Sequence, residues 1–191
     1  MSGNPYARLP SFPAELQIPL LHPLSGKTDT LVRADTLRQT PEELTDLIAA
    51  CNEPLLYGWL FRERQAGQPY DRARAASFYV WSREGWQAGS HFVFALLSPC
   101  GRLAGMLDIK STDLEAAEVG YWLRSAHSGL MGTALDALGT LAQQAGYRLL
   151  YARVRPGNRR SVAVLERSGW LAGVPDVDGT HLRYERRLVS A

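Results

Sequence analysis

Residues 116–135 have the sequence AAEVGYWLRSAHSGLMGTAL, and this stretch decides the fold. Residues 116–123 contain a run of branched and aromatic side chains typical of a β-strand. From Leu130 onward, apolar side chains recur at steps of three or four residues, as one face of a helix requires. Gly129 and Gly132 stand where the loop becomes this helix. The stretch therefore predicts a strand, a glycine-containing loop and a helix in direct succession.

Further strand and helix patterns lie on both sides of this stretch. On the N-terminal side, strands are predicted at TDTLVRA (28–34), HFVFALLS (91–98) and RLAGMLDIK (102–110), and helices over about 40–50 and 71–87. On the C-terminal side, strands are predicted at YRLLYARV (147–154), WLAGV (170–174) and HLRYERRLV (181–189), and a helix over about 159–168. This order predicts an α/β fold (an α+β mixed sheet) in which an antiparallel meander is followed by a β-α-β crossover, with helices on both faces.

The length of 191 residues suits one domain. Five prolines in residues 1–28 disfavour regular helix and predict a proline-rich, extended N-terminal arm that is laid over the body or left mobile, with one domain at 29–191. The first residues lack the features of a secretion signal, and no apolar run approaches the roughly 20 residues that span a bilayer. A cytoplasmic protein without a membrane partner is therefore expected.

The charged groups and cysteines exclude some classes of function. The formal net charge is only +2, which is too small to argue for nucleic acid as a partner, and none is expected. The two cysteines, Cys51 and Cys100, are far apart and lack the spacing of a metal site, so no metal is expected.

Three motifs in a fixed order carry a family resemblance. They are the strand AAEVGYWL (116–123), the glycine loop that opens a helix, and ARVRPGNRRSVAVLERSGW (152–170). Together, over about residues 89–172, they resemble the GNAT superfamily of acetyl-CoA-dependent N-acetyltransferases. They are most similar to the branch that acetylates the N-termini of ribosomal proteins. The resemblance implies a GNAT-like fold and acetyl-CoA as co-substrate.

The glycine loop corresponds to the pyrophosphate-binding loop of that family, whose pattern is Gln/Arg-x-x-Gly-x-Gly/Ala. The best match places Ala126 at the first position, Gly129 at the central glycine and Met131 at the last. The resemblance implies that coenzyme A is bound by the backbone of Gly129, Leu130, Met131, Gly132 and Thr133. A loop in which Gly129 only turns the chain is the alternative.

The same resemblance assigns the rest of the cofactor site. It implies that the pantetheine arm binds along the strand, through the main chain of Gly120, Tyr121, Trp122 and Leu123. It also implies a contact between Asn158 and coenzyme A, although an N-cap role at the following helix explains this residue equally well. Arg153, Arg155, Arg159 and Arg160 are candidates for the 3'-phosphate, or are simply exposed arginines.

Two residues are candidates for catalysis. Glu118 lies near the end of the predicted strand and is the candidate general base, acting through water; an ion pair at the strand end is the alternative. Ser161 matches the serine that protonates or stabilises the leaving thiolate in the ribosomal-type branch. The alternative is an ordinary solvated serine in the first turn of the helix. Many other branches carry a tyrosine seven residues after the asparagine, where this chain has Leu165, and this favours Ser161.

Acetyl transfer to an amine requires a neutral amine, a hydrogen-bond donor for the thioester oxygen and a proton source for the thiolate. A peptide α-amino group with a pKa near 8 is about one tenth neutral at pH 7, whereas a lysine is neutral in about one molecule in 2,000. We therefore favour N-acetylation of a protein or peptide N-terminus by a monomer or homodimer. Acetylation of a small amine, such as an antibiotic or polyamine, and a catalytically degenerate domain that binds a partner remain alternatives.

Overall fold

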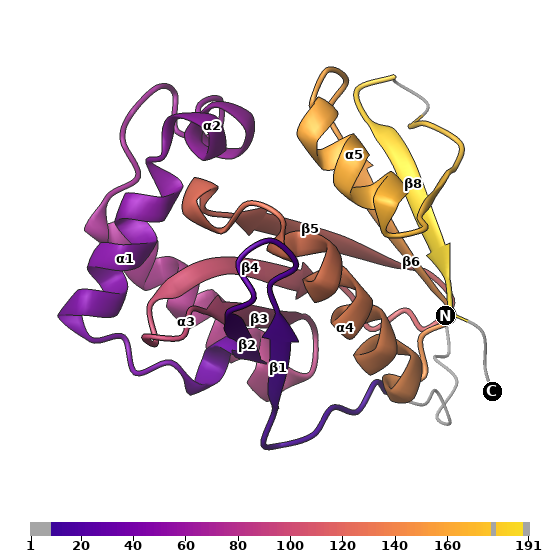
Figure 1. Ribbon diagram of the computed structural model, residues 1–191, viewed down its shortest axis with the longest axis horizontal. Helices are drawn as coiled ribbons and strands as arrows, with labels where there is room; N and C mark the ends of the chain where they lie inside the picture. The colour runs from indigo at the N-terminus through magenta and orange to yellow at the C-terminus, as the bar shows by residue number, and fades with distance from the viewer. Residues whose placement is uncertain (1–8, 177–178, 189–191) are drawn as a thin grey trace, which may run out of the picture.

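The computed structural model describes residues 9–176 and 179–188, and these form one mixed sheet with helices on both faces (Figure 1). The strands are β1 Gln17–Leu21, β2 Thr28–Arg33, β3 Phe92–Leu97, β4 Leu103–Ile109, β5 Ala117–Leu123, β6 Leu149–Val154, β7 Leu171–Ala172 and β8 Leu182–Arg187. Their spatial order is β1-β2-β3-β4-β5-β6-β8-β7, and only the β5–β6 pair among these neighbours is parallel. The predicted meander and crossover are confirmed.

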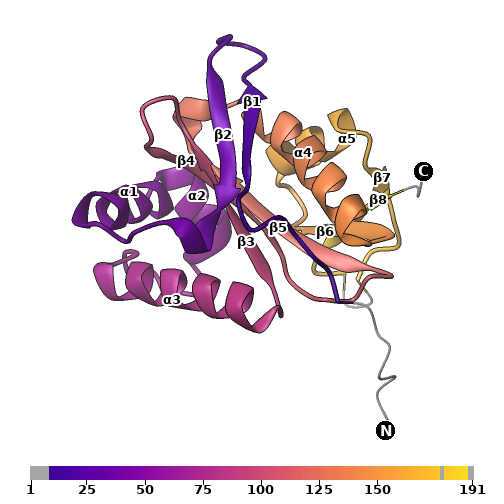
Figure 2. The same cartoon turned by 90° about the horizontal axis from the view of Figure 1, so that it is seen from below.

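The helices divide between the two faces of the sheet. They are η1 Ala34–Thr36, α1 Pro41–Cys51, α2 Pro54–Leu56, the π-helix η2 Tyr57–Phe61, α3 Arg72–Ala88, η3 Ser125–His127, α4 Leu130–Ala145 and α5 Arg159–Arg167. Helices α1 and α3 cover one face, and α4 and α5 lie on the other (Figure 2). Each face has its own apolar core: Leu47 and Tyr79 belong to the first, and Leu135 and Leu138 to the second.

Helix α1 begins where the sequence predicts it. The Thr40 hydroxyl accepts a hydrogen bond from the Glu43 amide at 3.2 Å, and the Glu43 carboxylate accepts one from the Thr40 amide at 3.0 Å. Pro41 occupies the first helical position, where its missing N–H costs nothing. This reciprocal cap satisfies donors that the helix itself leaves unpaired.

The N-terminal arm is the main correction to the predicted fold. The sheet does not begin near Asp29, because β1 lies within the predicted arm and pairs with β2 along its whole length. Leu20 is buried, and the ring of Phe12 packs 4.7 Å from that of Phe92. Pro19 is tolerated because β1 is an edge strand, where one side of the backbone needs no partner. Residues 1–8 of the arm lie outside the described residues.

Candidate active site

The site is built around the place where the two parallel strands separate. Strand β5 pairs with β6 only at Ala117 and Glu118, which lie opposite Leu150 and Tyr151. Beyond Glu118, β5 continues for five residues that are not paired with β6. Its backbone edge is therefore available there to a ligand that binds as an added strand.

Strand alternation decides which backbone groups face this open edge. The Glu118 carbonyl accepts a hydrogen bond from Lys110 and the Arg124 amide donates to Ala104, so the even-numbered residues direct their main-chain groups toward β4. The Gly120 amide likewise donates to Oδ1 of Asp108 at 2.7 Å. The Gly120 amide is therefore already hydrogen-bonded to Asp108, and a contact between the Gly120 main chain and the cofactor stays a prediction.

A cavity of about 540 Å³ lies beside this edge, between β5, the start of α4, helix α5 and the segment 55–60. Nine of the predicted site residues line it: Tyr121, Trp122, Leu123, Gly129, Met131, Asn158, Ser161 and the two candidate phosphate ligands Arg159 and Arg160. These residues come from two strand–helix units that are separate in sequence, and the fold brings them together. We call this space the donor cavity.

The charge of the donor cavity suits an anionic ligand with an apolar arm. Arg159, Arg160 and Arg167 line it, and among the described residues no carboxylate does. Leu55, Trp59 and other apolar side chains form much of the remaining wall. The two other arginines of the predicted cluster pair elsewhere: Arg153 with Asp176 at 2.5 Å, and Arg155 with Glu63 at 2.9 Å.

Helix α4 directs its N-terminus toward the donor cavity. Its N-cap is Gly129, in the left-handed region at φ 108°, and no side chain caps the helix. The first backbone N–H groups of a helix have no partner within it, so this end can bind an anion. The side chain of Leu130 is buried in the core, and Leu130, Gly132 and Thr133 do not line this cavity, so their predicted main-chain contacts with the cofactor stay a prediction.

Two hydroxyl groups meet in the donor cavity. The Tyr121 hydroxyl lies 2.6 Å from Oγ of Ser161, and the Ser161 amide donates to Oδ1 of Asn158 at 3.2 Å. Asn158 is thus the N-cap of α5, as one of the two interpretations requires. Burial raises the pKa of Tyr121 to about 12, against a smaller opposing effect of its bond to Ser161. The phenol therefore keeps its proton at neutral pH and can donate it.

The sequence did not indicate that the Tyr121 side chain reaches Ser161. The family resemblance implied only a main-chain role for Tyr121. Leu165, at the position of the tyrosine found in other branches, is fully buried and belongs to the core on the α4 side. The hydroxyl near Ser161 therefore comes from a different element, strand β5.

A second cavity of about 530 Å³ lies on the α1 and α3 side of the sheet. It shares Leu60, Tyr121 and Trp122 with the donor cavity, so these side chains stand between the two spaces. Asp108 of β4 lines it and was missed in the sequence, although a lone carboxylate in the apolar run LAGMLDI was a signal. We call this space the acceptor cavity.

Glu118 takes part in an ion pair. Its Oε1 lies 2.5 Å from Nζ of Lys110, and its Oε2 lies 4.0 Å from the guanidinium of Arg153. Glu118 does not line either of the two cavities described above. Its role as a water-mediated base stays a prediction.

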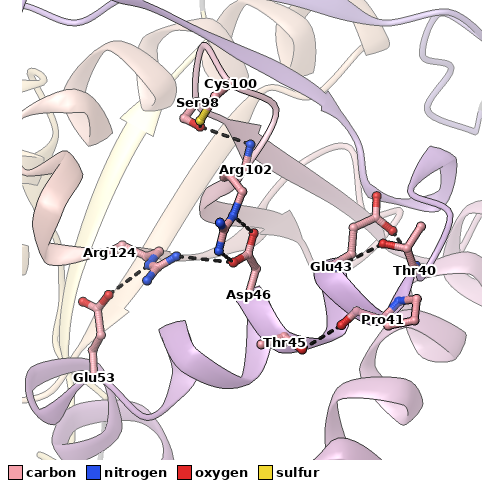
Figure 3. Close-up of polar contacts among 10 residues, drawn as sticks. All are labelled: Thr40, Pro41, Glu43, Thr45, Asp46, Glu53, Ser98, Cys100, Arg102 and Arg124. Atoms are coloured by element: carbon pink, nitrogen blue, oxygen red, sulfur yellow. Dashed lines mark hydrogen bonds and ion pairs between the residues drawn. The ribbon is translucent and has the colours of Figure 1, made fainter.

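An ion-pair network holds the start of segment 53–60 to the loop before α4 (Figure 3). This segment contains Leu60, which lines both cavities. Nε of Arg124 lies 2.9 Å from Glu53, whose second oxygen accepts a hydrogen bond from the Ser125 amide at 2.8 Å. Partial burial acts to raise the pKa of Glu53, but the bonds from Ser125 and Arg124 outweigh it and leave the pKa below its ordinary value. Asp46 of α1 joins this network through Arg124, 4.0 Å away, and also accepts a hydrogen bond from Arg102.

Immediately after Glu53, the chain forms α2 and the π-helix η2, which the sequence did not predict. A π-helix is rare and occurs frequently at functional sites. Here it supplies Leu60, which borders both cavities, and Trp59, which borders the donor cavity. Within the described residues, no helix has both the length and the apolar character needed to cross a membrane.

An open strand edge, a helix N-terminus and a basic wall without a carboxylate among the described residues meet in one cavity, a combination typical of an acyltransferase whose donor is a coenzyme A thioester. The model of the acetyltransferase (GNAT) domain matches residues 36–170. The chain belongs to the GNAT acetyltransferases, and acetyl-CoA is its co-substrate.

Solved structures share the fold at low sequence identity. RimJ of Mycobacterium smegmatis, in complex with CoA-disulfide, is 22% identical over 94% of this chain and 90% of its own, with a TM-score of 0.71. The ribosomal L7/L12 alpha-N-protein acetyltransferase RimL is 20% identical over 94% and 99%, with a TM-score of 0.69. The microcin C7 self-immunity acetyltransferase MccE, with acetyl-CoA and AMP, is 15% identical over 83% and 92%, with a TM-score of 0.64. We found no significant sequence match to a curated protein.

Proposed function

We propose that this acetyltransferase acts on the N-terminal α-amino group of a protein or peptide. The charge of the acceptor cavity carries the proposal. Asp108 is the one carboxylate among its described lining residues, whereas Arg64 and Lys110 bring two cations. Polyamines and aminoglycoside antibiotics carry several ammonium groups and need several carboxylates to replace their hydration. An acceptor with a single ammonium group fits this lining better.

In the proposed reaction, each cavity holds one substrate. The first turn of α4 and the nearby arginines bind the phosphates of acetyl-CoA, and the open edge of β5 binds the pantetheine arm. The thioester then lies near the Tyr121 and Trp122 wall that both cavities share. The amine attacks from the acceptor side, and Ser161, bonded to Tyr121, supplies a proton to the departing thiolate.

A small amine with one ammonium group on an apolar body is the second candidate. Aromatic side chains line much of the acceptor cavity, and they suit such a body as well as an N-terminal residue. The structural likeness to MccE, which is described as a microcin self-immunity enzyme, supports keeping this alternative. The monomer or homodimer state and the cytoplasmic location expected from the sequence stay predictions.

Binding and turnover test the proposed function in two steps. Acetyl-CoA at 100 times its dissociation constant should stabilise the fold by about 2.7 kcal/mol, measured as a shift in thermal unfolding. Mass spectrometry should then detect acetylation of peptides with free N-termini but not of the same peptides with blocked ones. Turnover of small amines alone would favour the second candidate. Binding without turnover of any amine would favour a catalytically degenerate domain.

A further inference from the structure

We propose that Asp108 binds the ammonium group of the acceptor and takes its proton, and that the aromatic walls around it select an N-terminal residue with a large apolar side chain. This inference rests on the proposed function and names the acceptor class of the same site. It assigns to Asp108 the role that the sequence assigned to Glu118.

The position of Asp108 depends on a glycine in the neighbouring strand. Asp108 lies opposite Gly120 in the β4–β5 register, and Oδ1 of its carboxylate accepts a hydrogen bond from the Gly120 amide at 2.7 Å. A Cβ atom at position 120 would lie 2.6 Å from the same oxygen, which is closer than real Cβ contacts allow. The strand glycine therefore makes room for this carboxylate, and the one hydrogen bond leaves acceptor sites on the carboxylate for a ligand.

The cations near Asp108 are neutralised or screened, so they do not prevent an ammonium ion from reaching it. Lys110 lines the same cavity, but its ammonium group lies 2.5 Å from Glu118 and is neutralised by that contact. Arg64 is exposed, so its charge is screened by solvent. Asp108 is left as the negative group that an incoming ammonium ion can reach within the described cavity.

The environment of Asp108 also suits proton transfer. Burial raises the pKa of Asp108 above its ordinary value, while Lys110, the Gly120 amide and His91 oppose the rise and Glu118 adds to it. A carboxylate with a raised pKa is a better base near neutral pH than an exposed one. Its pKa also moves toward that of an α-amino group, which lowers the cost of the transfer.

Aromatic rings surround the approach to Asp108. Phe61, Tyr70, Phe78 and Trp81 all line the acceptor cavity. Aromatic faces attract a nearby cation and bury an apolar side chain with little loss of side-chain freedom. Apart from Asp108, the exposed Arg64 and the paired Lys110, the lining offers little to hold a charged or strongly polar first residue, since burying such a group without a partner is costly.

The step balances as follows. The ammonium group gives one proton to the Asp108 carboxylate, and the neutral nitrogen attacks the thioester carbon to form the N–C bond. As the C–S bond breaks, the thiolate takes a proton from Ser161, and the nitrogen loses its second proton to restore the Ser161–Tyr121 pair through water. Asp108 then releases its proton to solvent. The products are the acetylated amine, free coenzyme A and one proton.

The first experiment compares carboxylate variants in turnover of a peptide that begins with phenylalanine. Asp108→Asn should lower kcat/KM about tenfold at pH 7, because about a tenth of the α-amino groups are neutral without a base. Acetyl-CoA affinity should stay unchanged, and Asp108→Glu should recover part of the activity. Glu115→Gln, which removes an exposed carboxylate paired with Arg148, is the matched control.

The pH profile separates a base from a structural residue. The loss in Asp108→Asn should grow to about a hundredfold at pH 6 and nearly vanish at pH 9, where the amine is neutral unaided. An equal loss at every pH would overturn the inference. So would full activity in Asp108→Asn, or this pH pattern in Glu118→Gln alone.

A binding experiment tests the inference without turnover. Phenethylamine, an aromatic ammonium ion, should bind the protein in the presence of coenzyme A more tightly than phenethyl alcohol, measured by calorimetry. Asp108→Asn should abolish this difference. Equal binding of the two probes would overturn the inference even if peptides are acetylated. Normal discrimination in a protein that acetylates no peptide would contradict only the proposed function.

Discussion

Replacement of Ser161 by alanine should lower kcat about tenfold to a thousandfold and leave the affinity for acetyl-CoA nearly unchanged, the pattern of an interaction made only in the transition state. The structure motivates this expectation because Oγ of Ser161 lies in the donor cavity, 2.6 Å from the Tyr121 hydroxyl. The phenol can pass its proton to the serine as the serine gives its own to the thiolate. Steady-state kinetics with a peptide acceptor and calorimetry with acetyl-CoA measure the two quantities.

Two further variants control this prediction. Thr140→Ala removes an exposed hydroxyl of α4 that lines neither the donor nor the acceptor cavity, and should keep near-normal kcat. Tyr121→Phe should lower kcat less than Ser161→Ala, because Ser161 keeps its own proton. Wild-type kcat in Ser161→Ala would contradict the assignment of this residue to the leaving thiolate.

Placing a carboxylate at Ser128 should weaken acetyl-CoA binding about tenfold to a hundredfold, because the new charge repels the pyrophosphate at the start of α4. Ser128 is exposed, lines the donor cavity and directly precedes the N-cap Gly129, so Ser128→Asp meets no steric barrier that would obscure the electrostatic effect. The dissociation constant, measured by calorimetry at low ionic strength, is the quantity to compare.

Ser128→Asn is the matched control, since it has nearly the same shape and no charge. Its affinity should stay close to that of the wild type. The difference between the two variants should shrink as salt is added, because exposed charges are screened within about 10 Å at 0.1 M salt. Equal affinities at low salt would place the phosphates away from this end of the helix.

Local patterns were sufficient for most of the fold. The capping box at Thr40 depends on residues only three apart, and the hairpin of β3 and β4 on the turn between them, so both could be predicted from neighbours in the chain. The sequence did not predict strand β1 within the N-terminal arm. A high proline density argues against a helix or an inner strand, but not against the edge strand that residues 17–21 form. The π-helix η2 has no comparable local signal.

The sequence by itself determined the order of the main strands and helices, which depends on periodicity and short spacings, and it contains the motifs around Gly129, Asn158 and Ser161 that carry the family resemblance. Only the tertiary structure decided which groups meet. Asp108 contacts Gly120 across a strand pair, and Tyr121 contacts Ser161 across the gap where β5 and β6 separate, forty residues apart in the chain. Such contacts follow from strand register and the direction of side chains in the assembled sheet, and a one-residue shift in register would remove them.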